Sequence, residues 1–250
     1  MVNRRAASAL IVFVVALAVY LFTMAPTVAL IDSGELTDAA WSLGNAHPPG
    51  FPLFVLVTHF FTMLPVRSVA WRANLASAFF SAAAAAFATL AAFEFKKERD
   101  ATVIAIATGL LFAFSRTVWR YAVETEVYAL NTALMAAIAW LMLVWTRTRR
   151  ATPLYAAALL FGLALGVHHV TIGLGALAIA MLITRTAGAA FWRSREAIVA
   201  GVLLCAGLLI YAYIPLAAAH NPAMNWGNPR TAHQIFDHVT GKEYRAYFTS

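Results

Sequence analysis

Three carboxylates lie close together near the start of the sequence. Asp32, Glu35 and Asp38 follow one another at intervals of three residues. If residues 33–44 form a helix, neighbouring carboxylates share one face of it and could bind a proton, a cation or a hydroxyl nucleophile. Ordinary helix capping is the alternative, with Asp32 or Ser33 as the N-cap and Glu35 in the first turn. We take Asp32 and Glu35 as candidate catalytic residues.

A proline-rich segment, residues 47–52, follows with the sequence His-Pro-Pro-Gly-Phe-Pro. It cannot be helical within itself, because each proline lacks an N–H donor and restricts the residue before it. The sequence therefore predicts a rigid elbow that holds the imidazole of His47 near the carboxylates. There it could contact a substrate by orienting a carboxylate or a phosphate. A plain turn into the next helix is the alternative.

The segment from Arg116 to Glu126 combines arginines, carboxylates and aromatic rings. This mixture suits an anionic lipid headgroup together with a sugar ring, because arginine binds phosphate through a planar fork. The alternative is an interfacial belt of aromatic residues with snorkelling arginines. Its candidate substrate-binding residues are Arg116, Arg120, Glu124 and Glu126.

Three further residues could contact a substrate. His168 and His169 are adjacent and point in different directions, which does not favour a shared metal ion, and buried hydrogen-bonded histidines are the alternative. Trp226 stands among turn-forming residues and could stack on a sugar or lie at a membrane interface. Cys205 is the single cysteine, and the sequence contains no zinc, calcium or nucleotide motif, so we expect no metal site.

The composition indicates what kind of protein must position these residues. Of 250 residues, 62% are hydrophobic and only 12% are charged, against about 45–50% and about 25% in soluble domains. Charge-free runs leave room for about seven membrane-spanning helices. The net charge of +7 comes from short basic clusters between these runs, which fits membrane topology better than nucleic-acid binding. The sequence thus predicts an all-α, polytopic membrane protein.

The basic clusters set the expected topology, because positive residues favour the cytoplasmic side. They are Arg4/Arg5, Lys96/Lys97/Arg99, Arg147/Arg149/Arg150 and Arg185/Arg193/Arg195. An even number of crossings must separate neighbouring clusters, yet three apolar runs lie between the first two. The run at residues 51–66 is short and flanked by prolines, so we predict an interfacial or re-entrant helix there.

The remaining runs then alternate across the membrane. Spans are expected at residues 6–24, 73–95, 101–115, 127–146, 151–167, 170–184 and 197–214. The N-terminus is then cytoplasmic, and residues 25–72 and 116–126 are outer loops. The predicted domains are a transmembrane module at residues 1–214 and an outer-face tail at 215–250, which we expect to begin a further C-terminal region.

Several motifs, in order along essentially the whole chain, resemble one bacterial family of integral membrane proteins. They are Asp32-Ser33-Gly34-Glu35, residues 47–53, residues 72–78, residues 126–130, His168-His169 and residues 225–229. That family shares its N-terminal domain with the animal endoplasmic-reticulum protein O-mannosyltransferase of plexin-type receptors, and looks like the GT-C glycosyltransferases. The resemblance implies a seven-helix module, acidic catalytic residues in a first outer loop with juxtamembrane helices, and a polyprenyl- or dolichyl-phosphate sugar donor.

The residues and the resemblance together predict a glycosyltransferase of the bacterial inner membrane, with its active site on the outer, periplasmic face. Asp32 is the expected general base that deprotonates an acceptor hydroxyl, with inversion at the sugar carbon. Glu35 is expected to orient that hydroxyl or Asp32. Arg116 and Arg120 are expected to stabilise the phosphate leaving group.

The expected partners are a lipid-linked sugar donor, a protein or glycan acceptor and the bilayer, with no nucleic acid. Mannose is the sugar of the animal relative. No cofactor is required, although a divalent cation could bind at Asp32 and Glu35. Two alternatives remain: a transporter or flippase for a lipid-linked substrate, with a coupling ion on the outer carboxylates, and a non-catalytic envelope subunit that would not depend on Asp32.

Overall fold

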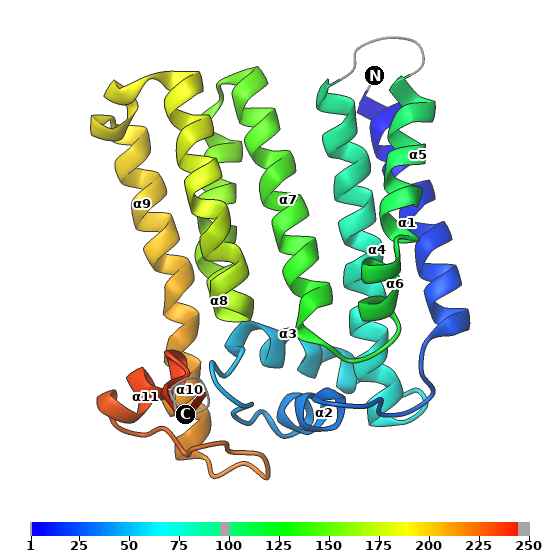
Figure 1. The fold of residues 1–250 in the computed structure, drawn as a ribbon, viewed down its shortest axis with the longest axis vertical. Helices are drawn as coiled ribbons and strands as arrows, with labels where there is room; N and C mark the ends of the chain where they lie inside the picture. The colour runs from blue at the N-terminus through cyan, green and yellow to red at the C-terminus, as the bar shows by residue number, and fades with distance from the viewer. Residues whose placement is uncertain (1, 96–100, 245–250) are drawn as a thin grey trace.

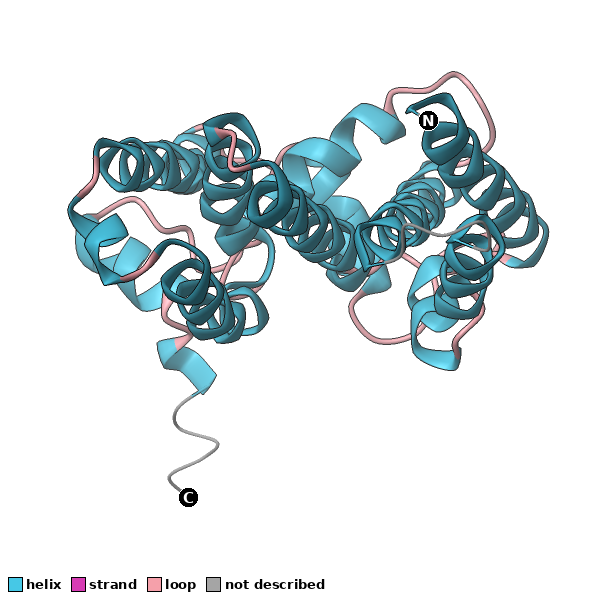
Figure 2. Cartoon of the chain, turned by 90° about the horizontal axis from the view of Figure 1, so that it is seen from above, coloured by secondary structure: helices cyan, strands magenta, loops and turns pink. Residues whose placement is uncertain are grey.

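The computed structural model describes residues 2–95 and 101–244. The regular secondary structure of these residues is helical, apart from one isolated β-bridge between Asn45 and Asn225. Long helices run side by side, and short helices gather at the end of the bundle opposite the N-terminus (Figure 1). Seen from above, the long helices appear nearly end-on (Figure 2). In chain order the elements are α1 (Val2–Thr23), α2 (Ser33–Ser42), α3 (Pro52–Thr62), α4 (Val69–Phe95), α5 (Ala101–Ala113), α6 (Arg116–Ala122), α7 (Val127–Thr148), α8 (Ala151–Ala187), η1 (Ala189–Arg193), α9 (Arg195–Leu208), η2 (Leu209–Ala212), α10 (Tyr213–Ala219) and α11 (Ala232–Val239).

Five helices in the described ranges are long and apolar enough to cross a membrane, and α5 with α6 makes a sixth candidate as a pair bent by 63°. The five are Arg4–Thr23, Val69–Phe95, Val127–Thr148, Ala151–Ala187 and Arg195–Ala219. Large apolar side chains such as Leu111 on α5 and Leu174 and Leu177 on α8 are exposed, as suits surfaces that face lipid. The prediction of an all-α, multi-pass membrane protein is confirmed.

Helix α8 counts once in that total, although it has two arms. Its 37 residues would extend about 55 Å if straight, well beyond a hydrocarbon core of about 30 Å. At His168 the backbone leaves the helical region, with φ −155° and ψ 84°. The two ends of α8 meet, because Arg149 Nη1 donates a hydrogen bond to the Thr186 carbonyl at 2.8 Å. Helix α8 therefore folds back at His168.

The folded α8 matches the two short spans expected at residues 151–167 and 170–184. If its two arms are counted separately and α5–α6 as one bent pair, the described residues contain seven candidate membrane crossings. They are α1, α4, α5–α6, α7, the two arms of α8, and α9. The expected helix at 197–214 is longer than predicted, since its apolar span runs from Arg195 to Ala219 through η2 and α10.

Helix α3 is too short to cross the bilayer. It has 11 residues, about 16 Å of helix, and lies beneath the ends of the long helices (Figure 1). Pro52 begins it at a position that needs no N–H donor, after Phe51 in the left-handed region at φ 44°. Phe54, Val55 and Thr58 bury one face. The short length of α3 agrees with the interfacial or re-entrant helix predicted at residues 51–66.

The second outer segment is helical where the sequence predicted a loop. Helix α5 ends at Ala113, Ser115 is extended, and α6 begins at Arg116. One face of α6 packs into the bundle through Trp119 and Ala122. The short helix within the predicted outer loop at residues 116–126 was not expected, because the break carries no proline or glycine and the amphipathic turn is too short to stand out in the sequence.

The segments expected on the outer face meet at one end of the bundle. The Ala25 N–H donates to the Val123 carbonyl at 2.8 Å. The buried amide of Asn74, in α4, donates to the carbonyls of Ala25 and Thr27, each at 2.9 Å, and its oxygen accepts from the Thr125 hydroxyl at 2.5 Å. Asn74 therefore ties the first loop to the connection between α6 and α7.

Basic residues gather at the opposite end. Glu94, whose side chain is 4% exposed, pairs with Arg5 at 2.8 Å and with Arg147, which joins α1, α4 and α7. The cluster Lys96/Lys97/Arg99 lies outside the described residues. The described basic clusters and the acidic loop thus occupy opposite ends of the bundle, as the topology argument requires.

Candidate functional site

Helix α2 carries the acidic segment at the end of the bundle. Its Leu36, Ala39 and Ala40 are buried against neighbouring elements, at the three- and four-residue spacing of one helix face. Asp32 precedes the helix but makes no capping hydrogen bond with its side chain. The Ser33 hydroxyl instead accepts from the Ala29 N–H at 3.1 Å. Capping therefore does not occupy the Asp32 carboxylate.

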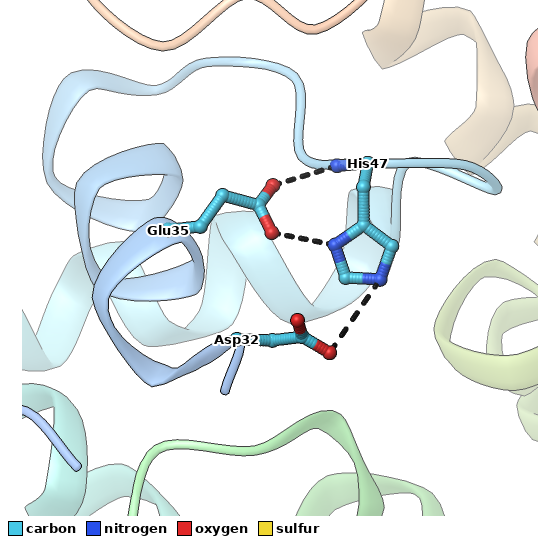
Figure 3. A group of neighbouring side chains, drawn as sticks. All are labelled: Asp32, Glu35 and His47. Carbon is cyan, nitrogen blue, oxygen red and sulfur yellow. Dashed lines mark hydrogen bonds and ion pairs between the residues drawn. The ribbon is translucent and has the colours of Figure 1, made fainter. Parts of the chain in front are cut away.

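Glu35 and Asp32 each face one ring nitrogen of the His47 imidazole (Figure 3). The His47 backbone N–H donates to Glu35 Oε1 at 2.7 Å, and the ring Nδ1 donates to Glu35 Oε2 at 2.5 Å. The other ring nitrogen, Nε2, lies 4.0 Å from Asp32 Oδ2. Glu35 therefore fixes both the backbone and the ring of His47, and turns Nε2 toward Asp32.

The carboxylates around His47 set its charge. Burial lowers the pKa of His47, but the hydrogen bond and charge of Glu35, together with the charges of Asp32 and Glu126, raise it above its ordinary value. The imidazole is therefore stabilised in its charged form. The sequence predicted that the elbow holds His47 near the carboxylates, and the structure places its ring between contacts to Glu35 and Asp32.

The gap between Asp32 and His47 is the right size for one oxygen atom. Two atoms 4.0 Å apart can each lie about 2.8 Å from a shared hydroxyl oxygen, which is an ordinary hydrogen-bond length. The same cluster could instead hold a metal ion, since Asp32, Glu35 and His47 each offer one ligand atom within 4.8 Å of the others. Carboxylate and imidazole ligands would suit a divalent transition metal.

A pocket of about 230 Å³ opens beside this cluster. It lies where α2, the elbow, the start of α7 and the fold of α8 meet. Its lining residues are Asp32, Leu36, His47, Pro48, Pro49, Phe51, Glu126, Val127, Tyr128, His168, His169, Val170 and Tyr244. Five residues predicted from the sequence thus line one pocket. Glu35 stands behind His47 and does not line it.

Glu126 forms part of the wall opposite the elbow. It is the N-cap residue of α7 and is 7% exposed. Burial, and then the negative charges of Asp32 and Glu124, raise its pKa to about 7, against smaller opposing effects of His47 and Arg120. Near neutral pH a substantial fraction of Glu126 is therefore protonated and can donate a hydrogen bond.

The two histidines reach the pocket because α8 folds back beside it. The His168 ring lies 5.5 Å from the Tyr128 ring, centroid to centroid. Thr171 in the returning arm bonds Asn131 of α7 at 3.2 Å. The buried Nδ1 of His169 has no hydrogen-bond partner among the residues described. Tyr128, which belongs to the motif at residues 126–130, also lines the pocket.

The arginines lie outside the pocket. Arg116 and Arg120 are exposed on α6. Arg120 pairs with Glu124 at 3.7 Å and lies over the Tyr121 ring at 5.9 Å. The described lining of the pocket contains no lysine or arginine. The expected positive charge beside a leaving phosphate is therefore not supplied by these two side chains in this conformation.

Two other residues singled out by the sequence also lie outside the pocket lining. The Trp226 ring lies 6.1 Å from the His47 ring, and its Nε1 donates to Glu243 at 3.1 Å. Asp38 is exposed on α2, so the three-residue periodicity brings only Asp32 and Glu35 to the cluster.

Comparison with known proteins places most of this site within one family. The sequence model described as "Protein O-mannosyl-transferase TMEM260 N-terminal domain" matches residues 32–190. The mouse "Protein O-mannosyl-transferase TMEM260" is 30% identical over 250 residues, which cover 94% of this chain and 34% of the mouse protein. A Dictyostelium discoideum protein of the same description is 30% identical over 142 residues, 56% of this chain and 17% of that protein.

The chain thus spans about a third of the length of the mouse relative and less of the Dictyostelium one. No solved structure matches the chain.

Proposed function

The chain belongs to the family of the TMEM260 N-terminal domain, and from this premise we propose that it is a membrane glycosyltransferase of the GT-C type. It moves a sugar from a polyprenyl-phosphate donor to an acceptor hydroxyl on a protein or glycan. The observation that carries this proposal is the approach of Asp32 Oδ2 and His47 Nε2 to 4.0 Å, with Glu35 behind the imidazole. The relatives' description as protein O-mannosyl-transferases supports it.

Asp32 is the general base in this mechanism. The acceptor hydroxyl lies between Asp32 and His47, and its proton passes to the Asp32 carboxylate as its oxygen attacks the anomeric carbon. The bond from that carbon to the phosphate oxygen breaks, and the electron pair stays on the lipid phosphate. Attack from the face opposite the phosphate inverts the anomeric configuration.

His47 and Glu35 position the acceptor. The charged imidazole donates a hydrogen bond from Nε2 to the acceptor oxygen and holds it against Asp32. Glu35 acts through His47, since both of its carboxylate oxygens bind that residue. This replaces the expectation that Glu35 orients the hydroxyl or Asp32 directly.

The opposite wall of the pocket receives the sugar phosphate. Glu126, Tyr128, His168 and His169 line it, and a protonated Glu126 repels a phosphate less than a carboxylate would. The rings of Tyr121 and Tyr128 lie 4.5 Å apart, centroid to centroid, and connect this wall to Arg120. We assign Arg116 and Arg120 to the lipid headgroup region outside the pocket, and not to the transferring phosphate.

The site faces the outer side of the membrane in this proposal. The described basic residues Arg5, Arg147 and Arg149 lie at the opposite end of the bundle from the pocket, and positive residues favour the cytoplasm. The N-terminus is then cytoplasmic, and the pocket opens on the periplasmic face of a bacterial inner membrane. The lipid-linked donor reaches the pocket from the bilayer.

Radiolabelled polyprenyl-phosphate sugars test the function. Full-length protein is purified in detergent, and both transfer to acceptor and slow donor hydrolysis are followed. We expect Asp32→Asn to lower transfer at least about 100-fold, as the loss of a general base does. Asp38→Asn, on the exposed side of the same helix, is the matched control and should retain activity. Unchanged turnover in both Asp32→Asn and Glu35→Gln would sink the assignment.

The same assay decides whether a cation takes part. The mechanism above needs no cofactor, so chelation with EDTA should leave transfer unchanged. If EDTA abolishes transfer and added Mn²⁺ or Mg²⁺ restores it, Asp32, Glu35 and His47 act as metal ligands, and Asp32 is not a simple base.

A further inference from the structure

The tail of the chain pairs with the elbow that carries His47. The Asn45 N–H donates to the Met224 carbonyl, and the Trp226 N–H donates to the Asn45 carbonyl, both at 3.0 Å. The fully buried Asn45 side chain donates to Asn225 Oδ1 at 3.0 Å and to the Ile214 carbonyl at 3.1 Å. The chain two residues before the elbow is therefore bonded to a segment about 180 residues away in the sequence.

Gly44 allows this pairing. A Cβ atom at Gly44 would overlap the Met224 carbonyl oxygen, so no other residue fits without moving the tail. The Tyr213 hydroxyl also donates to the Gly44 carbonyl at 3.1 Å. The tail and the residues directly before the elbow thus meet at backbone distance.

His238 supports the elbow on its other side. Its side chain is 4% exposed and packs against Gly50, where a Cβ would lie 3.0 Å from His238 Nε2. Gly50 has φ +90°, a conformation that favours glycine. That Nε2 is buried without a hydrogen-bond partner in the residues described. The Trp226 ring completes the support, 6.1 Å from the His47 ring.

We propose that this tail positions His47 for the reaction, with Asn225 and His238 as positioning residues. The inference rests on the proposed function, in which His47 holds the acceptor oxygen. Glu35 fixes the His47 ring from one side only, and the tail fixes the backbone of the elbow from the other. Errors of about 1 Å in a catalytic group cost about 100-fold in rate. The family model matches residues 32–190, so Asn225 and His238 lie outside the region that this model covers, although the match to the mouse relative covers 94% of the chain.

The pH dependence of transfer tests this inference. Asn225→Ala and His238→Ala should lower kcat about 10-fold with a nearly unchanged KM for the donor. They should also move the basic limb of the pH profile to lower pH, because a loosened His47 loses its bond to Glu35. The ionisable groups around His47 are Glu35, Asp32, Glu126 and His238. His233→Ala is the matched control, since His233 is exposed on the same α11 helix, and should change neither.

Three outcomes decide the inference. A basic limb that moves supports it. A profile that is lower at every pH but not displaced means fewer folded molecules and overturns it, as does unchanged activity. Asn225→Asp, which keeps the acceptor oxygen for Asn45, should restore most of the activity lost in Asn225→Ala even if the alanine variant folds poorly. Loss of activity in Asp32→Asn but not in the tail variants would reject the tail's role and leave the proposed function standing.

Discussion

Glu35 binds His47 through both of its carboxylate oxygens, one on the backbone N–H at 2.7 Å and one on ring Nδ1 at 2.5 Å. A carboxylate that accepts two bonds from one residue fixes the place of that residue and the orientation of its ring. The second ring nitrogen then faces Asp32 across 4.0 Å. Asp32 and Glu35 are therefore not equivalent: Glu35 holds the His47 imidazole in place, and Asp32 faces its free nitrogen.

Removing the charge of Glu35 should show this division of roles. In Glu35→Gln, the amide oxygen can still accept the His47 N–H, but the negative charge that raises the pKa of His47 is lost. We expect the basic limb of the transfer profile to shift to lower pH, and turnover at pH 7.5 to fall about 10- to 100-fold. Asp32→Asn, in contrast, should lower turnover at every pH. Identical profiles in the two variants would contradict the separate roles.

The sequence was sufficient for the parts of this site that lie close together in the chain. Asp32, Glu35 and His47 fall within 16 residues, and the prolines that directly follow His47 limit the backbone conformation at that residue. Likewise, the short length of the run at 51–66 and its flanking prolines were enough to predict α3. These features depend on local composition and helix length, which a single sequence displays.

Contacts between distant segments could not be predicted in the same way. Glu126 and His168 share a pocket only because α8 folds back at His168; the sequence predicted the two crossings at 151–167 and 170–184 but not the packing of His168 beside the start of α7. The bond between Asn45 and Asn225 depends on how the whole bundle closes. Arg120 lies outside the pocket because Trp119 and Ala122 bury the opposite face of α6, and a helix of seven residues was too short to recognise from its periodicity.

The free energy of unfolding should fall as the pH rises, because the pKa of Glu126 is higher in the folded protein than in the unfolded chain. Its pKa rises from 4.5 to about 7 on folding, so the folded state retains a proton that the unfolded chain releases. Unfolding free energy therefore decreases between about pH 4.5 and 7. Glu126→Gln should remove this component, on the order of 1 to 3 kcal/mol. Thermal unfolding in detergent at pH 5 and pH 8 measures it, and an equal pH dependence in both proteins would contradict the role of Glu126.

Helix α9 should depend on two glycines for its packing on α8. A Cβ at Gly162 would overlap the Leu204 carbonyl, and one at Gly207 would lie 2.6 Å from the Leu159 carbonyl. Small residues allow such close approach between membrane helices. Gly162→Ala should lower the unfolding free energy by about 1–3 kcal/mol, measured by thermal unfolding. Gly175→Ala is the control, because a Cβ added at Gly175 would have nothing within 4 Å. Comparable losses of stability in the two variants would argue against the close contact between α8 and α9.

The sidedness of the bundle gives the last prediction. Residues 69 and 150 lie at opposite ends, since Val69 begins α4 beside the pocket end and Arg150 precedes α8 beside the basic end. The short helix α3 does not cross, so α4 is the one crossing between the end of α1 at residue 23 and residue 95. Residue 69 therefore lies on the same side as the end of α1. In a Cys205→Ala background, Val69→Cys should react with an impermeant maleimide added outside intact cells.

Arg150→Cys should react with the same reagent only after the cells are permeabilised. Each cysteine is the control for the other, because both positions lie at the ends of long helices but at opposite ends of the bundle. If Val69→Cys were labelled only after permeabilisation, the pocket would face the cytoplasm. The acceptor would then have to be cytoplasmic, and the positive-inside argument from Arg5 and Arg147 would fail together with the proposed periplasmic site.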